Sequence, residues 1–275
     1  CWSVTRRDGV AFGFTDHDCD LAFEGVTFRA DTGLTARALA QSTGLSVDNT
    51  EALGALSDAA VTEADILAGR FDGAEVRHWL VNWQDVRQRA LQFAGTIGEI
   101  RRGGGAFEAE LRGLSELLNR PIGRVYQRHC PAVLGDAQCR VSLENPTFSV
   151  ETTVLAAEDR TVLRCGGLGG FASGWFERGR LLVKTGAGAG LSAAVKRHRR
   201  AGGGAEIELW QALGADLVPG DLIRLEAGCD KRAETCRAKF ANFLNFRGFP
   251  HIPGEDWLTT FPARDGVNDG GSLNR

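Results

Sequence analysis

The sequence predicts a mainly β protein with two strand-rich domains, a few short helices, and a C-terminal helix followed by an extended arm. Two patterns predict the strands: apolar and polar residues alternate over short segments, and glycine-rich turns separate these segments. The 36 glycines far outnumber the 7 prolines, which favours tight turns and bulges. Because 275 residues exceed the usual size of one hydrophobic core, we expect two domains, at 1–127 and 128–275.

The composition argues against several classes of protein. The formal charge of -3 argues against a general binder of nucleic acid or membrane surfaces. No apolar run approaches the ~20 residues of a membrane-spanning helix, so no membrane span is expected. Seven cysteines are an odd number in a long chain, which is atypical of a secreted disulfide scaffold. Clustered thiols that hold a metal, assembled in a reducing compartment, are the simpler interpretation.

The first domain is expected to begin with a hairpin. Asp8 and Gly9 predict a type I′ turn between strands at 2–5 and 10–14. Thr62, with Asp65 three residues later, predicts the capped start of a helix at 63–68. Val76, Trp79, Val81 and Trp83 are expected near one another on a partly buried strand at 75–83. The other predicted elements are strands at 91–101 and 107–111, a short helix or long loop at 34–57, and a short helix at 114–119.

Asp16, His17, Asp18 and Asp20 lie close together and allow two interpretations. A metal site would use their carboxylate and imidazole groups as ligands. A polar turn would use the carboxylates as hydrogen-bond acceptors for its own backbone. The polar turn is favoured, because the glycine that a calcium-binding loop needs is absent.

The second domain is expected to contain a β module at 146–227. Phe148, Val150, Thr152 and Val154 alternate on one face and predict a strand at 147–156. Further strands are expected at 161–165, 175–184, 207–212 and 222–225. Short strands at regular spacing predict a small antiparallel barrel or sandwich. One basic run separates two of these strands and is interpreted as a solvated hairpin tip rather than a phosphate site: Lys196, Arg197, His198, Arg199 and Arg200.

From Lys231 the spacing of apolar residues becomes helical. Ala233, Cys236, Phe240 and Leu244 share one apolar face with Phe243, which predicts a helix at 231–244 that buries Cys236. The residues from 245 to 275 are rich in Gly, Pro, Asn and Asp. They predict an extended arm whose aromatic side chains pack against another surface, such as a neighbouring subunit.

Four cysteines form two pairs, Cys130 with Cys139 and Cys229 with Cys236, at the spacings C-x8-C and C-x6-C. We expect the β module between the pairs to bring them together around one inorganic centre. Two disulfides would need an oxidising compartment. A structural zinc site usually takes cysteines spaced C-x2–4-C, which neither pair shows. An iron–sulfur cluster is a larger object and suits the longer loops, so a cluster is favoured over zinc.

Neighbouring residues favour the cluster. Pro131 follows Cys130, as proline follows a ligand cysteine in bacterial ferredoxins. Gly228 allows the backbone to approach closely before Cys229. Cations that can offset the negative charge flank the four cysteines: Arg124, Arg128, Arg140, Lys231, Arg232 and Arg237. Three cysteines without a partner at ligand spacing (Cys1, Cys19 and Cys165) and His129 are not expected to be ligands.

These cysteine pairs, the segment 14–18 (Phe-Thr-Asp-His-Asp) and the segment 248–254 (Gly-Phe-Pro-His-Ile-Pro-Gly) resemble one family over nearly the whole chain. The family is the phage-like tail hub, or baseplate hub, protein of gene transfer agents and related siphophage tails. The cysteine spacing is also similar to that of minor tail protein L of lambda-like phages, which carries an iron–sulfur cluster. There the stretch between the pairs is shorter, whereas here the β module fills it.

The resemblance implies structural work in a virion rather than catalysis. It implies two domains that resemble tail-tube β-barrels, and a homotrimer that adapts the sixfold tail tube to a threefold tip. It implies a structural [4Fe-4S] cluster on Cys130, Cys139, Cys229 and Cys236. The implied partners are the distal tail protein and the host-contacting tip or fibre protein, with the tape-measure protein and tail peptidase as further candidates. Assembly would take place in the bacterial cytoplasm, and DNA would pass through the lumen without specific binding.

Two other functions stay open from the residues alone. An iron–sulfur protein for electron transfer or redox sensing would use the same four cysteines. Nothing else in the chain favours it, because the glycine runs lie in predicted hairpins and not in strand-to-helix turns that bind nucleotides. An enzyme such as a cell-wall hydrolase is not expected, because no nucleophile, histidine and acid stand out as a set.

Overall fold

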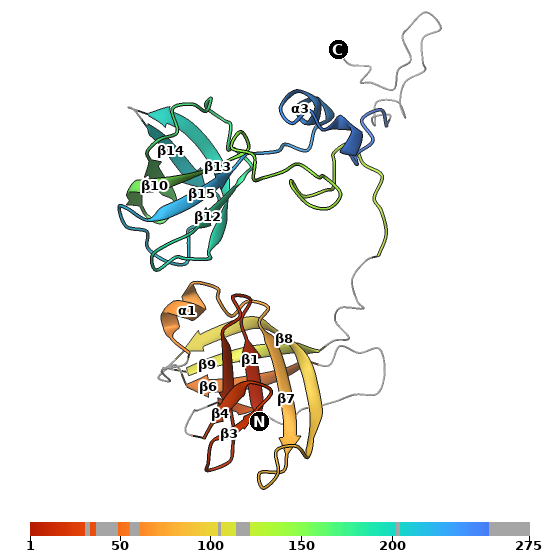
Figure 1. Ribbon diagram of the computed structural model, residues 1–275, viewed down its shortest axis with the longest axis vertical. Helices are drawn as coiled ribbons and strands as arrows, with labels where there is room; N and C mark the ends of the chain where they lie inside the picture. The colour runs from red at the N-terminus through yellow and green to blue at the C-terminus, as the bar shows by residue number, and fades with distance from the viewer. Residues whose placement is uncertain are drawn as a thin grey trace, which may run out of the picture. The chain divides into compact units, whose positions relative to one another are not determined.

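The computed structural model describes residues 1–30, 34–36, 49–55, 61–103, 106–113, 122–201 and 204–252. Contacts within the chain divide it into two units, Cys1–Ile122 and Gly123–Arg275 (Figure 1). The sequence places this division slightly later, after residue 127. Each unit is rich in strands and has its own hydrophobic core, which confirms the mainly β fold.

The first unit is built on one nine-stranded sheet. Its strands are β1 (Trp2–Thr5), β2 (Ala11–Phe14), β3 (Leu21–Phe23), β4 (Val26–Arg29), β5 (Leu34–Ala36), β6 (Asn49–Ala55), β7 (Glu75–Val81), β8 (Arg89–Gly103) and β9 (Ala106–Gly113). They follow the order β3-β4-β2-β1-β7-β8-β9-β6-β5. Neighbours are antiparallel except β2 and β4, which are parallel. Figure 1 shows the curved sheet, with the helix α1 (Glu63–Leu67) near one end of its strands.

The hairpin at the start of the chain is confirmed, but its turn is not type I′. β1 and β2 pair with Trp2 opposite Phe14 and Thr5 opposite Ala11. The Gly9 N–H donates to the Arg6 carbonyl over 3.0 Å, and Gly9 has a φ of 87°. A type I′ turn also needs a positive φ at the residue before the glycine, and Asp8 does not have one. The turn is therefore longer and needs only one left-handed residue.

The capped helix is confirmed as α1. The Asp65 N–H donates to the Thr62 Oγ1 atom over 3.1 Å. The prediction of a helix or loop at 34–57 is wrong where this range is described, because β5 and β6 are strands. β6 pairs with β9 along its whole length, from Asn49 to Ala55, so cross-strand pairing outweighs the weak β-propensity of this alanine-rich stretch. The predicted helix at 114–119 lies outside the described residues.

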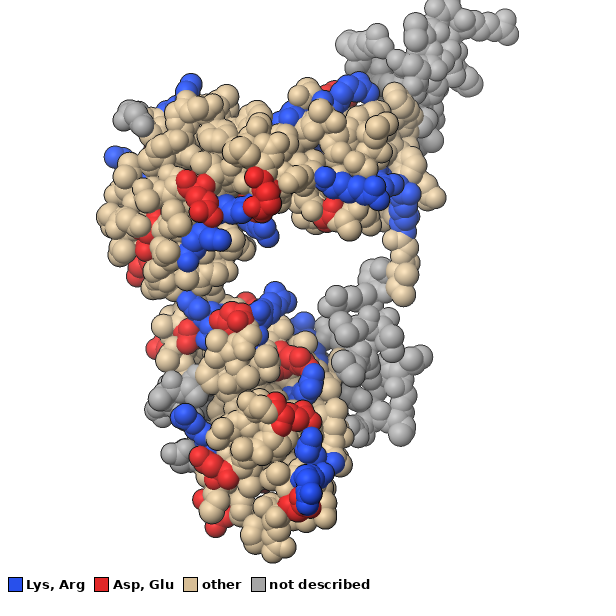
Figure 2. All heavy atoms as spheres, viewed as in Figure 1, with Lys and Arg blue, Asp and Glu red and all other residues tan. Residues whose placement is uncertain are grey.

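The strand predicted at 75–83 is confirmed up to Val81. The register shifts between His78 and Trp79, as at a β-bulge, so Val76 and Trp79 are both buried although they are three residues apart. Trp83 lies beyond the strand and is 58% exposed, so its predicted burial is wrong. Figure 2 shows basic and acidic side chains mixed over the visible face of this unit.

The second unit contains a closed six-stranded antiparallel barrel. Its strands are β10 (Ser149–Glu158), β11 (Val162–Cys165), β12 (Arg180–Val183), β13 (Ser192–Ala201), β14 (Gly204–Leu209) and β15 (Leu222–Glu226). They close in the order β10-β11-β14-β13-β12-β15. The interior is filled by apolar side chains that are fully buried, including Leu163, Phe176, Leu181, Ile207 and Ile223. The predicted barrel is thereby confirmed, although β12 is shorter than the strand expected at 175–184.

The basic run does not form a hairpin tip, so that prediction is wrong. It lies within β13, where Val195 and His198 are buried and the other basic side chains point outward. Glu208 on β14 pairs with Lys196 and with Arg197, each over 2.6 Å. Glu206, also on β14, pairs with Arg199 over 3.7 Å, so two acids on the adjacent strand offset part of the positive charge.

A small lobe formed by residues 123–148 and 228–252 lies beside the barrel in Figure 1. It contains the helix α3 (Ala233–Ala238) and the 3-10 helix η1 (Phe243–Asn245). The predicted helix at 231–244 is therefore too long, because Ala241 has a φ of 48° and breaks it. Leu244 is exposed, whereas Phe240 packs with Val141 and Ala227 in a small core.

Among the described residues, no helix is long and apolar enough to cross a membrane. The part of the predicted arm at 253–275 lies outside the described residues. Its first part, 246–252, lies along residues 124–129 of the same unit: the Phe249 N–H donates to the Gln127 carbonyl over 2.9 Å.

Candidate metal centre

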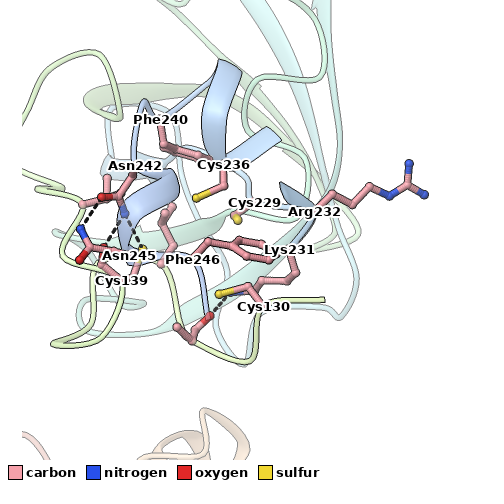
Figure 3. A pocket seen from close by; sticks show the side chains of 13 residues that line it. Cys130, Cys139, Cys229, Lys231, Arg232, Cys236, Phe240, Asn242, Asn245 and Phe246 are labelled. Carbon is pink, nitrogen blue, oxygen red and sulfur yellow. Dashed lines mark hydrogen bonds between the residues drawn. The ribbon is translucent and has the colours of Figure 1, made fainter. Parts of the chain in front are cut away.

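The four paired cysteines line one pocket in the small lobe (Figure 3). Cys130 and Cys139 come from the loop before the barrel, and Cys229 and Cys236 from the segment after it. The remaining lining residues are mainly apolar or amide-bearing: Ala132, Leu134, Val141, Lys231, Arg232, Phe240, Asn242, Asn245 and Phe246. Figure 3 shows the labelled sulfur atoms facing this shared space. The structure therefore brings together the four residues that the sequence identifies as ligands.

Asp136 shapes the first cysteine loop. Its carboxylate accepts the N–H groups of Val133, Gln138 and Cys139, over 2.9, 2.9 and 2.6 Å. The backbone hydrogen bond from Cys139, followed by other contacts, holds the pKa of Asp136 below its usual value. An aspartate that binds its own following backbone is typical of a tight turn, and here the turn places Cys139 at the pocket.

The second cysteine segment reaches the pocket because Gly228 has no side chain. A Cβ at Gly228 would overlap the Glu177 carbonyl, which lies in the turn that leads into β12. The Gly228 N–H donates to the Trp175 carbonyl over 2.9 Å. This close backbone contact sets the path of the chain just before Cys229.

Lys231 joins the two cysteine segments. The Cys130 N–H donates to the Lys231 carbonyl over 2.9 Å, and the Lys231 Nζ donates to the Ala132 carbonyl over 2.5 Å. Lys231 has a φ of 65°, a left-handed conformation that bends the chain between Cys229 and α3. The approach of residues about a hundred positions apart in sequence is thus fixed by hydrogen bonds.

The start of α3 is organised by Asp230. Its carboxylate accepts the Arg232 N–H over 3.0 Å and the Thr235 hydroxyl over 2.9 Å. One turn later, Cys236 is buried on the inner face of the helix, as the sequence predicts. After the helix, the Asn242 Nδ2 atom lies 3.7 Å from the Cys139 Sγ atom and also donates to the Cys139 carbonyl.

The thiols are close enough to affect one another's pKa. Burial, and then the nearby thiols of Cys229, Cys139 and Cys130, raise the pKa of Cys236 to about 11. Burial also raises the pKa of Cys229, against the lowering effect of Lys231. Such thiols stay protonated at neutral pH, so a bound metal must displace their protons.

Four thiols in one apolar pocket are the donor set of soft metals and of iron–sulfur clusters. Among the described residues, no group of three or more His, Cys, Asp or Glu side chains is placed to hold a single metal ion. The four cysteines that line the pocket nonetheless supply a complete four-thiolate donor set.

The other sequence candidates lie elsewhere. Cys1 and Cys19 belong to the first unit, and Cys165 is fully buried in the barrel core. His129 is exposed next to Cys130 and does not line the pocket. Asp20 accepts the Ala30 N–H over 2.9 Å, and the His17 N–H donates to the Thr15 Oγ1 atom. The Asp20 contact is a carboxylate-to-backbone hydrogen bond, as expected of a polar turn, although Ala30 is ten residues away. The acceptor for His17 is a hydroxyl and not a carboxylate.

Of the six flanking cations, only Lys231 and Arg232 line the pocket, and Figure 3 shows Arg232 directed away from the sulfur atoms. Arg124 and Arg128 instead bind the carbonyls of Arg247 and Ile252. Lys239 and Asn242 also contact the cysteine segments, at Gly228 and Cys139, and are not among the residues expected from the sequence. Nothing in the local pattern marks them, because their partners lie far away in the sequence.

Comparison with known proteins gives consistent matches. A family model described as "Baseplate hub protein, N-terminal attachment domain" matches residues 1–142. A second, described as "Phage conserved hypothetical protein BR0599", matches residues 174–256. The comparison with curated proteins gave no match.

One similar solved structure is a chain of a particle described as "Virion of native gene transfer agent (GTA) particle". The two chains are 56% identical, with a TM-score of 0.90, and the match covers 99% of this chain and 94% of that one. The baseplate-hub model alone spans more than half of the 275 residues. This chain therefore belongs to the family of phage baseplate hub proteins, structural components of the virion at the tip of the tail.

Proposed function

We propose that this hub protein holds a structural [4Fe-4S] cluster on Cys130, Cys139, Cys229 and Cys236, and that the cluster ties together the two segments of the small lobe that flank the barrel. The single observation that carries the proposal is the meeting of these four thiols in one pocket. The cysteines bind the cluster, and the cluster supplies a cross-link between the two ends of the inserted barrel.

The sequence spacing of the cysteines supports a cluster rather than zinc. Structural zinc sites usually take cysteines spaced C-x2–4-C, whereas these pairs are spaced C-x8-C and C-x6-C. A four-iron cluster is a larger body than one ion, so it suits ligands on longer loops.

The small lobe has a small hydrophobic core, which supports a role for the cluster in stabilising its fold. Its buried apolar cluster contains only Val141, Ala227 and Phe240, with a few half-buried neighbours. α3 has six residues, too short to be stable without tertiary contacts. In such a lobe the free energy of metal binding contributes directly to folding.

The proposal extends to assembly at the tail tip. Two strand-rich units per subunit would give a trimer six β domains, which would match a sixfold tail tube to a threefold tip. The distal tail protein would bind on the tube side and the host-contacting tip or fibre protein on the opposite side. The tape-measure protein and tail peptidase are further candidate partners. In this arrangement DNA passes through the lumen, and the chain has no catalytic role.

Anaerobic purification with an absorption spectrum and metal analysis tests the cluster. We expect a broad absorption band at about 400 nm and about four irons per chain. A colourless protein that contains zinc would refute the cluster.

Serine variants of two ligands test the role of the cluster in folding. We expect Cys139→Ser and Cys236→Ser each to lose iron and to give insoluble protein or particles without tails. Cys19→Ser is the matched control, because Cys19 is exposed and belongs to the first unit. Normal assembly of both ligand variants without bound iron would show that the cluster does not hold the lobe together.

A further inference from the structure

Lys239 caps the C-terminal end of α3 and is half-buried between the small lobe and the barrel. Its ammonium donates to the carbonyls of Trp175, over 2.6 Å, and Gly228, over 2.8 Å. It lies 4.4 Å from the centroid of the Trp175 ring and 5.5 Å from that of Phe240. The partners that hold Lys239 are therefore carbonyl dipoles and aromatic rings.

The Lys239 Nζ atom joins three segments: the end of α3, the segment at Gly228 and the turn at Trp175. Gly228 directly precedes the ligand Cys229, and Lys239 follows Cys236 by three residues. Trp175 belongs to the turn that leads into β12, and its indole N–H donates to the Thr147 carbonyl over 3.1 Å at the start of the barrel. A single ammonium thus connects both C-terminal ligand positions to the barrel.

The charge of Lys239 has no close carboxylate partner. No ion pair within 4.0 Å joins Lys239, or Lys231 on the other side of the pocket, to an acid among the described residues. Burial lowers the pKa of Lys239, and Cys229, Asp230 and Glu177 act against this lowering, with Cys229 first. A half-buried cation is stabilised when an anion lies near it. Four thiolates around a cluster core of charge +2 would carry a net charge of about -2.

We propose that Lys239 is a positioning residue that holds the Cys229 and Cys236 segments against the barrel and supplies counter-charge to the cluster. This inference rests on the proposed [4Fe-4S] centre. It gives the lysine two roles, an anchor for the backbone and a fixed positive charge. Loss of the positive charge is expected to disfavour the more negative, reduced form of the cluster.

Three variants of the full chain, purified without oxygen, test the proposal. Lys239→Met removes the charge and keeps an unbranched side chain, and Lys239→Arg retains the charge. Lys196→Met is the matched control, because Lys196 also lies near a tryptophan ring, Trp210 at 5.8 Å, but on the barrel surface. The measurements are iron per chain and the midpoint potential in a redox titration.

For Lys239→Met we expect about a tenfold smaller ratio of reduced to oxidised cluster at a fixed potential, equivalent to a midpoint lower by about 59 mV. The midpoint potentials of Lys239→Arg and Lys196→Met are expected to stay close to that of the unmodified chain. If Lys239→Met loses its iron, retention of iron by Lys239→Arg supports the proposal, and loss from both variants overturns the counter-charge role.

An iron-loaded Lys239→Met variant with an unchanged potential overturns the inference and leaves the cluster in place. An unmodified chain without iron overturns both the cluster and the role of Lys239. The two failures are therefore distinguishable from the metal content of the unmodified chain.

Discussion

His198 is the only basic residue of the run at 196–200 whose side chain enters the barrel. It is 1% exposed, and its ring packs edge-on against Phe176 at 5.0 Å. Neither ring nitrogen has a hydrogen-bond partner among the described residues. Burial lowers the pKa of this imidazole, Glu177 acts to raise it, and Arg200 and Lys239 lower it further. The folded barrel therefore selects the neutral ring.

This selection predicts a loss of stability in acid. The stability that the neutral ring contributes is fully present above the unfolded pKa of 6.5, and it is lost as the pH falls below that value. We expect the thermal midpoint of the second unit to fall more between pH 7 and pH 5 in the unmodified chain than in His198→Leu. His251→Leu is the control, since His251 is exposed. Equal pH dependence in all three proteins would contradict this account.

At the scale of elements, a bulge explains why the sequence obscures β13. In β13 the register shifts between Val195 and Arg197, so the two buried side chains, Val195 and His198, are three residues apart. A search for alternation at every second residue misses such a strand. The shift in β7 at His78 has the same effect on a strand that its aromatic residues still reveal. β10 also has a register shift, between Val154 and Ala156, but the regular alternation from Phe148 to Val154 lies before it and predicts the strand from the sequence.

The contact between the Cys229 segment and the turn before β12 gives a second prediction. Gly228→Ala would drive a Cβ into the Glu177 carbonyl, and neither backbone segment can move away easily. We expect a loss of more than about 3 kcal/mol in the free energy of unfolding, together with loss of iron. Denaturant unfolding and iron analysis provide the measurements. Gly170→Ala is the control, because nothing lies within 4 Å of its added Cβ, and a mild effect of Gly228→Ala would refute the contact.

At the scale of the whole molecule, the sequence predicts which cysteines are ligands but not how they meet. Cysteine spacing and the apolar face of α3 select Cys130, Cys139, Cys229 and Cys236. The pocket itself depends on contacts between distant segments, such as the hydrogen bond from Lys231 to Ala132. Local patterns carry no information about such contacts, so the contacts of Lys239 with Gly228 and of Asn242 with Cys139 are visible only in the fold.

The separate cores of the two units lead to a prediction about the proposed cluster. Removal of the metal with a chelator under reducing conditions is expected to expose amides in the small lobe, at 123–148 and 228–252. Protection from hydrogen exchange should persist in β1–β9, because that unit has its own buried core. Hydrogen exchange followed by peptide mass spectrometry measures both regions at once. Equal loss of protection throughout the chain would show that the units do not unfold independently.

The pairing of residues 124–128 with 247–252 has a mechanical consequence. Three hydrogen bonds join the two segments: the Arg124 side chain donates to the Arg247 carbonyl, the Phe249 N–H to the Gln127 carbonyl, and the Arg128 side chain to the Ile252 carbonyl. The first segment lies at the start of the second unit. A pull on the chain from the side of the first unit therefore reaches these hydrogen bonds before it reaches Cys130. Tension applied along the chain at the tip of a tail would then load this pair before the cysteine pocket.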